Sequence, residues 1–414
     1  MHLLTLIFLL AVGLTTGLRF WLALRQVKAV TAHREAVPME FAAAIPLEAH
    51  RKAADYTVAR VRLGLVDLVV GSLFLLWLTL GGGMQAVFDA WAPSLVPGGY
   101  GHGVAFLASL ALLGFLVDLP FSLYRTFVVE ERFGFNKMTW RLWLGDLLKE
   151  SLLAAVIGLP VLFAVLWLMA RMGELWWLWV WAFWLGFNLL VLLVYPTFIA
   201  PLFNKFTPLA DEALAQRIGA LLVRCGFRVS GLFVMDGSRR SAHGNAYFTG
   251  FGAAKRIVFF DTLLEKLSPP EVEAVLAHEL GHYKHRHIWQ RVALLATISL
   301  CLLAGLGYLI EQPWFFHGLG MTSQGTAPAL ALFSLAIPVF TFPFSPLMSQ
   351  VSRCHEFQAD AYAARQTQAT DLASALAKLY RDNAATLTPD PLYSSFHDSH
   401  PPAAIRIARL LDRS

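Results

Sequence analysis

Long apolar runs separated by shorter polar segments dominate the hydropathy pattern of this chain. Seven runs approach the roughly 20 residues that an α-helix needs to cross about 30 Å of hydrocarbon. They lie near residues 3–24, 60–81, 103–124, 151–170, 176–197, 288–310 and 327–348. Two longer stretches, at about 200–287 and 350–414, are polar. The pattern therefore predicts a mainly α-helical integral membrane protein with about seven transmembrane helices.

The same pattern divides the chain into four parts. We expect an N-terminal membrane region of five helices (1–197), a polar part (198–287), two further membrane helices (288–348) and a C-terminal polar part (349–414). Because two membrane crossings return the chain to the side it left, the two polar parts should meet. The stretches LFVMD, NAYFTGF and KRIVFF are rich in β-forming residues and are divided by glycine-rich turns, which predicts a small sheet there.

Some of the apolar runs contain residues that avoid lipid. Such residues either kink a helix or face a polar chamber between the helices, and the sequence leaves both alternatives open. They are Asp118, Pro120, Pro160, Asn188, Pro338 and Pro343.

The distribution of Lys and Arg predicts the orientation in the membrane. Five lie between the first and second runs and five between the third and fourth, whereas residues 82–102 and 311–326 contain none. Basic residues favour the cytoplasmic side, so we expect the N-terminus outside and both polar parts in the cytoplasm. The first run has only Met1 and His2 before it and positive charge after it, so we expect a retained anchor and not a cleaved signal.

Composition agrees with a membrane protein and excludes other classes. The chain is 57% hydrophobic and 15% charged, whereas soluble domains have about 25% charged residues. The net charge of +5 comes without a basic run interleaved with aromatic residues, so we expect a lipid bilayer as partner and no nucleic acid. Cys225, Cys301 and Cys354 lack CxxC spacing, which predicts free thiols.

The stretch AHELGHYKHRH contains the spacing of a metal site. Helix-start signals precede it, so His278 and His282 should lie one turn apart on one helix face, where both can bind one ion. Glu279 should reach a water molecule on that ion and act as general base, as in the H-E-x-x-H motif. His285 lies about 10 Å further along the helix axis than His278. We therefore expect it, with His287, near the membrane interface.

A third ligand is expected from the C-terminal polar part. Catalytic zinc takes three protein ligands and keeps one position open. In CHEFQADAYAARQ, Glu356 and Asp360 lie one helical turn apart. Glu356 would complete the ligand set with the two histidines, and Asp360 would accept the free ring N–H of one of them.

Several stretches of the chain resemble the type I CAAX prenyl endopeptidases, integral-membrane zinc metalloproteases whose seven membrane helices surround a large water-filled chamber. The stretches occur in the family's order over nearly the whole chain. The long N-terminal half distinguishes the chain from the shorter bacterial heat-shock membrane metalloproteases. The matching stretches are VVEERFGFNKMT (128–139), YPTFIAPLFNKFTPL (195–209), DGSRRSAHGNAYFTGFGAAKRIVFFDTLL (236–264), HELGH (278–282), EFQADAYA (356–363) and SHPPAAIRIARL (399–410).

The resemblance implies roles for individual residues. It makes His278, His282 and Glu356 zinc ligands and Glu279 the general base, and it also singles out Asn245, His400 and Arg406. Asn245 would hold the backbone of a peptide added to the edge of the sheet. His400 would stabilise the oxyanion of the reaction. Arg406 would pair with Asp360 or with a substrate carboxylate.

These features together predict a membrane-embedded, zinc-dependent endopeptidase similar to the CAAX prenyl proteases, with a gluzincin-like domain and one Zn²⁺ per chain. Its substrates would be peptides or proteins, including lipidated or membrane-associated ones. One alternative keeps the chemistry and assigns the enzyme to quality control of membrane proteins. Another is a transporter or lipid-handling protein with structural zinc, although structural sites normally have four protein ligands.

Overall fold

The computed structural model describes residues 2–249 and 256–412. In this part of the chain, seven helical segments are long and apolar enough to cross a membrane, which confirms the sequence prediction. They are Leu3–Ala32 (α1), Leu47–Leu78 (α2), Tyr100–Glu130 (α4 and η2), Trp140–Arg171 (α5, η3 and α6), Gly173–Phe203 (η4, α7, η5 and α8), His287–Leu309 (α12) and Thr326–Gln366 (α14, η8 and α15).

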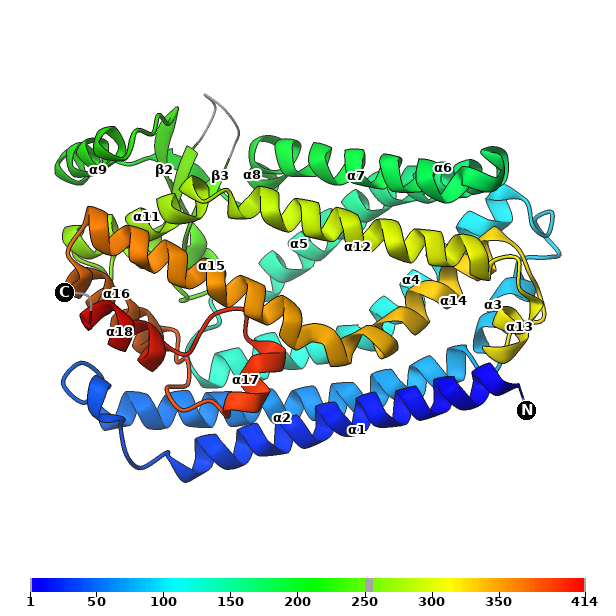
Figure 1. Cartoon of the computed structure of the whole chain (residues 1–414), viewed down its shortest axis with the longest axis horizontal. Coiled ribbons are helices and arrows are strands. Elements are labelled where there is room, and N and C mark those ends of the chain that lie inside the picture. Colours follow the sequence, from blue (N-terminus) through cyan, green and yellow to red (C-terminus); the bar gives the residue numbers. More distant parts are fainter. Residues whose placement is uncertain (1, 250–255, 413–414) are drawn as a thin grey trace.

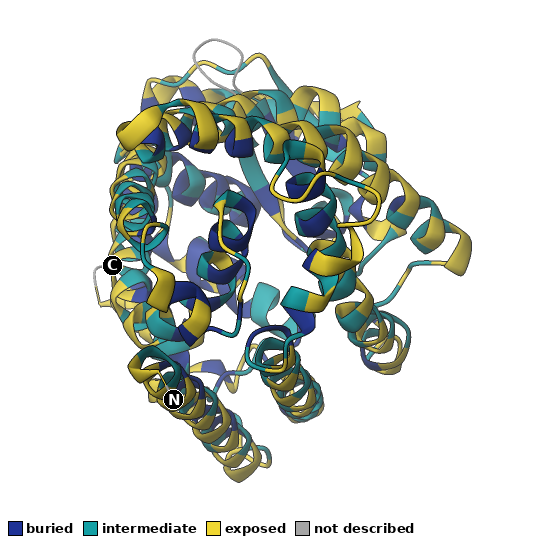
Figure 2. Ribbon diagram, turned by 90° about the vertical axis from the view of Figure 1, so that its right-hand side faces the viewer, coloured by how far each residue is buried: buried dark blue, intermediate teal, exposed yellow. Residues whose placement is uncertain are grey.

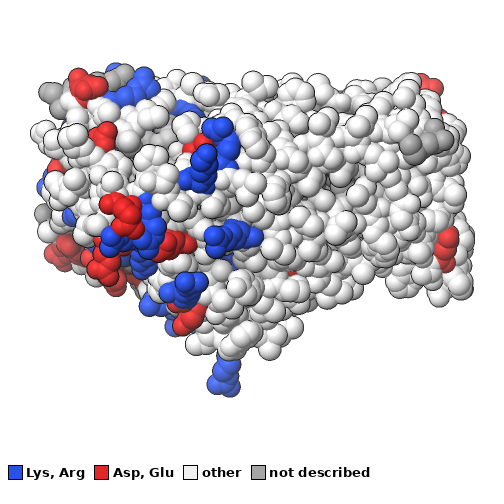
Figure 3. All heavy atoms as spheres, turned by 90° about the horizontal axis from the view of Figure 1, so that it is seen from below, with Lys and Arg blue, Asp and Glu red and all other residues white. Residues whose placement is uncertain are grey.

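The long helices lie roughly side by side, with the N-terminus at one end of the molecule and the polar part at the other (Figure 1). On the face shown in Figure 3, charged side chains gather at the polar end, and the surface along most of the length of the helices is almost free of them. Viewed along their length, the helices carry many exposed residues on the outside of the bundle (Figure 2). This arrangement suits a bundle whose outer surface contacts lipid.

Prolines accompany several irregularities in the membrane helices. The π-helical turns Ala154–Gly158 and Tyr195–Ile199 come just before Pro160 and Pro201. Proline has no amide hydrogen and its ring crowds the preceding turn, which a wider π turn accommodates. A 3₁₀ turn, Phe342–Phe344, joins α14 (Thr326–Thr341) to α15 (Ser345–Gln366). The seventh membrane segment therefore continues directly into the helix that carries Glu356 and Asp360.

A four-stranded sheet lies in the polar part, with strand order β1-β2-β4-β3. Its strands are Phe206–Pro208 (β1), Gly231–Met235 (β2), Ala246–Thr249 (β3) and Arg256–Phe260 (β4). The parallel pair β2 and β4 forms its centre, and β3 is an outer strand. The expected stretches supply β2, β3 and β4, whereas β1 was not expected. Parts of NAYFTGF and KRIVFF, at 250–255, lie outside the described residues.

One hydrophobic core unites the two polar parts of the chain. Leu276 and Leu280 of this core precede the sixth membrane helix in the sequence. Ala363, Leu372 and Ile407 come from the C-terminal part of the chain, which includes the end of the seventh membrane segment. The helices of the polar part are Glu212–Cys225 (α9), Asp261–Leu264 (α10), Pro269–Lys284 (α11), Ala369–Asp382 (α16), Pro391–His397 (α17) and Ala403–Leu411 (α18); short helices Gly83–Ala90 (α3) and Pro313–Gly318 (α13) lie at the opposite end.

A cavity of about 1010 Å³ lies between the first two membrane helices and the C-terminal helices. Tyr56 and Arg60 line it from α2, and His400 and Arg406 line it from the C-terminal part. The membrane helices therefore border a chamber with a partly polar lining. None of the six lipid-averse residues named above is among its lining residues, so the choice between kink and chamber stays open for them. The three cysteines are free, as predicted.

Candidate active site

Helix α11 begins with a capping arrangement that ties it to α16. The backbone N–H of Ser268 donates to the Glu271 carboxylate at 2.7 Å. Ser374 and Lys378 of α16 also donate to Glu271, at 2.6 and 2.7 Å. Burial alone would raise the pKa of Glu271, but Lys378 and the other donors outweigh burial and lower it to about 2. The first turn of the helix with the metal-site histidines is therefore fixed electrostatically.

A glycine allows α11 and α15 to approach closely. A Cβ atom at Gly281 would lie 2.8 Å from Cα and 3.0 Å from the carbonyl oxygen of Ala359. Atoms of the backbone cannot move aside as a flexible side chain can, so only glycine fits here. The contact brings His278 and His282 on α11 opposite Glu356 and Asp360 on α15.

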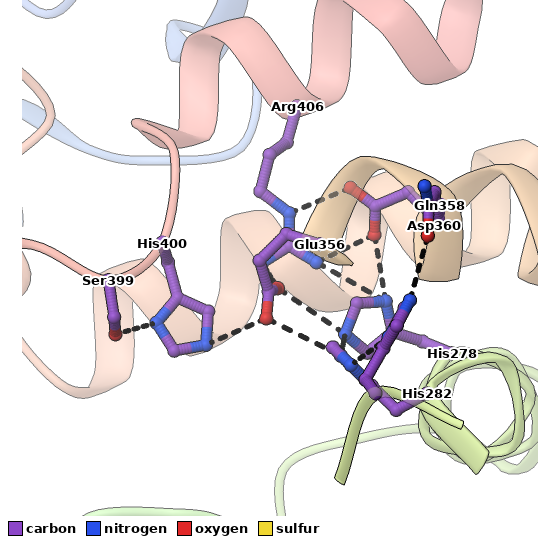
Figure 4. A network of polar contacts seen from close by, with 9 residues as sticks. His278, His282, Glu356, Gln358, Asp360, Ser399, His400 and Arg406 are labelled. Carbon is purple, nitrogen blue, oxygen red and sulfur yellow. Dashed lines mark hydrogen bonds and ion pairs between the residues drawn. The ribbon is translucent and has the colours of Figure 1, made fainter. Parts of the chain in front are cut away.

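Three side chains, those of His278, His282 and Glu356, converge into a group that can hold a metal ion and is called the metal group below. One ligand atom each from His278, His282 and Glu356 lie within 4.8 Å of one another. The two Nε2 atoms are 3.1 Å apart, and they lie 3.5 and 3.4 Å from the Glu356 oxygens (Figure 4). Ligand atoms at zinc distances around a tetrahedral centre lie about 3.3–3.6 Å apart. Oε2 of Glu356 is buried and accepts no hydrogen bond from the described residues, although Nη1 of Arg406 lies 3.3 Å away. The carboxylate therefore keeps a lone pair for a cation.

A buried ion pair orients the first histidine. Oδ1 of Asp360 lies 2.9 Å from Nδ1 of His278, which leaves Nε2 directed at the metal position. Arg406 from α18 donates to both oxygens of Asp360, at 2.8 and 2.7 Å, and its Nη1 lies 3.3 Å from Glu356 (Figure 4). Burial lowers the pKa of His278, but Asp360 and Glu356 outweigh burial and raise it to about 9. The surroundings therefore favour positive charge.

A chain of polar side chains orients the second histidine. Nδ1 of His282 lies 3.0 Å from Nδ1 of His287, and Nε2 of His287 lies 2.8 Å from Oε1 of Gln358. Because an amide oxygen only accepts, His287 donates from Nε2 and accepts from His282, whose Nε2 is left free for a metal. His287 also stacks on His355, with ring centroids 4.0 Å apart.

No pattern in the sequence predicts that His287 takes part in this arrangement. It is the first residue of α12, as expected for the membrane interface, but its side chain is buried and turns toward the site. Arg286 before it has a left-handed backbone, with φ 57°, where α11 ends and α12 begins. A helical period cannot be extended across such a turn, so spacing from His282 carried no usable signal.

The remaining expected residues lie at different distances from the metal group. Glu279 is partly buried on α11, and burial raises its pKa, which makes its carboxylate a stronger base. Nε2 of His400 lies 3.3 Å from Oε1 of Glu356, and its Nδ1 contacts Ser399 at 3.0 Å (Figure 4). Asn245 is exposed just before β3, where its side-chain oxygen accepts from the Ala246 N–H at 2.8 Å. Asn245 thus marks the sheet edge and not the metal group.

Comparison with known proteins agrees with this arrangement. Residues 26–205 match a family described as CAAX prenyl protease N-terminal, five membrane helices, and residues 208–414 match peptidase family M48. The chain belongs to peptidase family M48. This M48 peptidase is 40% identical to CAAX prenyl protease 1 of Saccharomyces cerevisiae over 75% of its own length and 72% of the relative's. It is 38% identical to CAAX prenyl protease 1 homolog of Arabidopsis thaliana, over 74% and 72%.

A solved structure shares the fold over almost the whole chain. The crystal structure of S. mikatae Ste24p has a TM-score of 0.91 and 32% sequence identity, and the match covers 98% of this chain and 99% of that one. The M48 peptidase is therefore a multi-pass membrane protein and a metalloendopeptidase acting on peptides or proteins, as predicted. Membership in a peptidase family favours catalysis over the alternative of a transporter with structural zinc.

Proposed function

We propose that the enzyme is a zinc endopeptidase in which His278, His282 and Glu356 hold the metal and Glu279 is the general base. The observation that carries this proposal is the convergence of two imidazole nitrogens and one carboxylate within 4.8 Å. Three such ligands match catalytic zinc, which keeps its fourth position for water or substrate.

The surrounding residues supply the remaining steps. When bound, a zinc ion would polarise the scissile carbonyl and acidify a water molecule. Glu279 takes the proton of the attacking water and returns it to the leaving amine. His400 donates its Nε2–H to the oxyanion. Arg406 holds Asp360, which keeps the ring of His278 in place. The side-chain amide of Asn245 donates to a substrate backbone that extends the sheet at β3.

The Glu279→Gln variant tests the role of the general base. We expect it to retain about one zinc per chain and to lose peptidase activity by at least about 10³-fold, because the ligand set is untouched. Zinc analysis and cleavage of an internally quenched peptide measure both quantities. Glu265→Gln, at an exposed position before α11, is the control and should behave as the parent protein. Normal turnover by Glu279→Gln would refute the mechanism.

His400 has a different expected signature. If His400 stabilises the oxyanion, His400→Ala should keep its zinc and its KM, and its kcat should fall by about 10²- to 10³-fold. Ser395→Ala, on the nearby α17, serves as control. Zinc loss in His400→Ala would make the residue a ligand, and an unchanged kcat would remove it from the mechanism.

We further propose that the substrate is a protein whose C-terminus carries a prenylated cysteine. The named relatives are CAAX prenyl proteases, and the solved Ste24p structure shares the fold of this chain. Kinetics with farnesylated and unmodified forms of one peptide test this. A higher kcat/KM for the farnesylated form supports the assignment. Equal cleavage would favour membrane-protein quality control instead.

The orientation proposed from the basic residues places the metal site in the cytoplasm. A cysteine at Ser94 or Gln324, both exposed at the end opposite the polar part, should react with an impermeant thiol reagent outside intact cells. A cysteine at Glu212 on α9 should not react, and the parent protein gives the background from its native thiols. The reverse labelling pattern would place the metal site on the outer face.

A further inference from the structure

The large cavity has a cationic lining away from the metal group. Arg19 from α1, Arg60 from α2 and Arg125 from the start of η2 all line it. The same cavity is lined by His400 and Arg406, which lie 3.3 Å from Glu356 on either side, so the cavity opens beside the proposed metal site. A molecule that contacts His400 therefore enters the cavity that the three membrane-helix arginines line.

These three arginines form no ion pair with any carboxylate in residues 2–249 and 256–412. Aromatic rings orient two of them: Arg19 lies over Phe342 at 5.2 Å from the ring centroid, and Arg60 lies over Tyr56 at 5.4 Å. On the same helix as Arg19, by contrast, Arg25 pairs with Asp390 at 2.9 Å. The C-terminal part of the chain thus supplies a carboxylate, Asp390 before α17, to one arginine of α1 but forms no ion pair with Arg19.

The acidic residues of the lining do not cancel this charge. The lining contains two acidic residues, Asp67 and Asp398, compared with the three membrane-helix arginines. Arg406, the fourth arginine of the lining, is already held by Asp360 and Glu356. The lining itself thus keeps a small excess of positive charge, with three arginines against two aspartates, and its arginines are available to an anion that enters the cavity.

We propose that Arg19, Arg60 and Arg125 form a subsite that binds a carboxylate of the peptide substrate. The inference rests on the proposed peptidase function, since the occupant of a cavity that opens beside the active site is then a peptide. The planar guanidinium group donates two parallel hydrogen bonds to a carboxylate, and this geometry gives arginine its selectivity for such groups. In a peptide, the carboxylate is either the C-terminal group or an acidic side chain.

Three versions of one cleavable, internally quenched peptide test the subsite and distinguish these sources. The first has a free C-terminus, the second a C-terminal amide, and the third an amide with a glutamate next to it. We expect the free acid to exceed the amide in kcat/KM by about tenfold, chiefly through KM. The same ranking should appear in binding to Glu279→Gln, measured by fluorescence anisotropy. Preference for the third peptide over the second would identify an acidic side chain as ligand.

Substitution of the arginines locates the effect. In Arg60→Gln and Arg125→Gln, and in the variant that combines them, the ratio of acid to amide cleavage should fall toward one. Arg62→Gln is the matched control, because Arg62 is exposed on α2 and does not line the cavity. Each ratio is measured within one protein preparation, so partial unfolding does not alter it.

The outcomes separate this inference from the proposed function. Zinc-dependent cleavage with equal rates for all three peptides would overturn the subsite and leave the peptidase intact. A preference that persists in the arginine variants would also overturn it. Cleavage that survives in Glu279→Gln would instead overturn the proposed mechanism.

Discussion

The contact of α11 with α15 and the exposed side of α12 at Gly305 differ in how closely they are packed. At the site, a Cβ atom at Gly281 would overlap the backbone of α15, whereas one at Gly305 on α12 would meet no atom within 4 Å. The site also buries Glu356, Asp360 and Arg406, but only 6% of the most apolar window of α12 is buried. Close packing and buried charges fix ligand geometry, while lipid can cover what the membrane helices leave exposed.

The largest effect should come from removing Glu356, the proposed carboxylate ligand. Glu356→Ala leaves two histidines, which are too few for tight zinc binding. It also removes the carboxylate that His400 and Arg406 contact. We expect loss of bound zinc and at least about a 10³-fold loss of activity, by metal analysis and peptide cleavage. Leu347→Ala, on an exposed position of the same helix, should keep both. One zinc per chain in Glu356→Ala would exclude Glu356 as a ligand.

A glycine pair tests the packing difference directly. Gly281→Ala should lower the stability in detergent by about 1–3 kcal/mol, because backbone atoms of α15 must shift to admit the methyl group. Gly305→Ala should be neutral or slightly stabilising, since the space around it is open and alanine favours helices. Thermal unfolding of both variants gives the comparison. Equal effects at the two positions would show that the close approach of α11 and α15 is not rigid.

Breaking the series of polar contacts from His282 through His287 to Gln358 should have a smaller effect, which is a change in zinc affinity. Gln358→Ala removes the acceptor that orients His287 and should weaken zinc binding by about tenfold. Gln290→Ala removes a similar amide, which contacts His355 at 3.0 Å and no ligand, and should leave zinc affinity unchanged. Competition with a chelator measures both affinities. Identical zinc affinities in the two variants would show that the contact between His287 and Gln358 does not orient His282 for metal binding.

The smallest predicted effect concerns pH. The pKa of Glu271 is lowered from the usual 4.5 to about 2 in the folded protein. Its contribution to stability is therefore fully present above pH 4.5 and is lost as the pH falls toward about 2. Glu271→Gln should show a shallower fall in thermal midpoint over this range, by about 1 kcal/mol of stability. Glu35→Gln, at an exposed ion pair, should follow the parent curve.

Sequence predicted the parts of this molecule that depend on local patterns. Seven membrane helices follow from hydropathy, and the pairing of His278 with His282 follows from one helical turn. The strand β1, the contact of Gly281 with Ala359 and the position of His287 were not predicted. Each depends on segments that meet only in the folded chain, where no spacing rule applies.

The order of residues in the chain has a consequence for biosynthesis. His278 and His282 precede the sixth membrane helix, Glu356 follows the bend in the seventh, and Arg406 lies on α18. A nascent chain emerging from the ribosome therefore holds the histidines long before their carboxylate partner. If these residues hold the metal as proposed, hydrolytic activity requires that both late helices have been inserted and that α18 has been made. On that assignment, unfinished copies of the protease would not cut the proteins being synthesised around them.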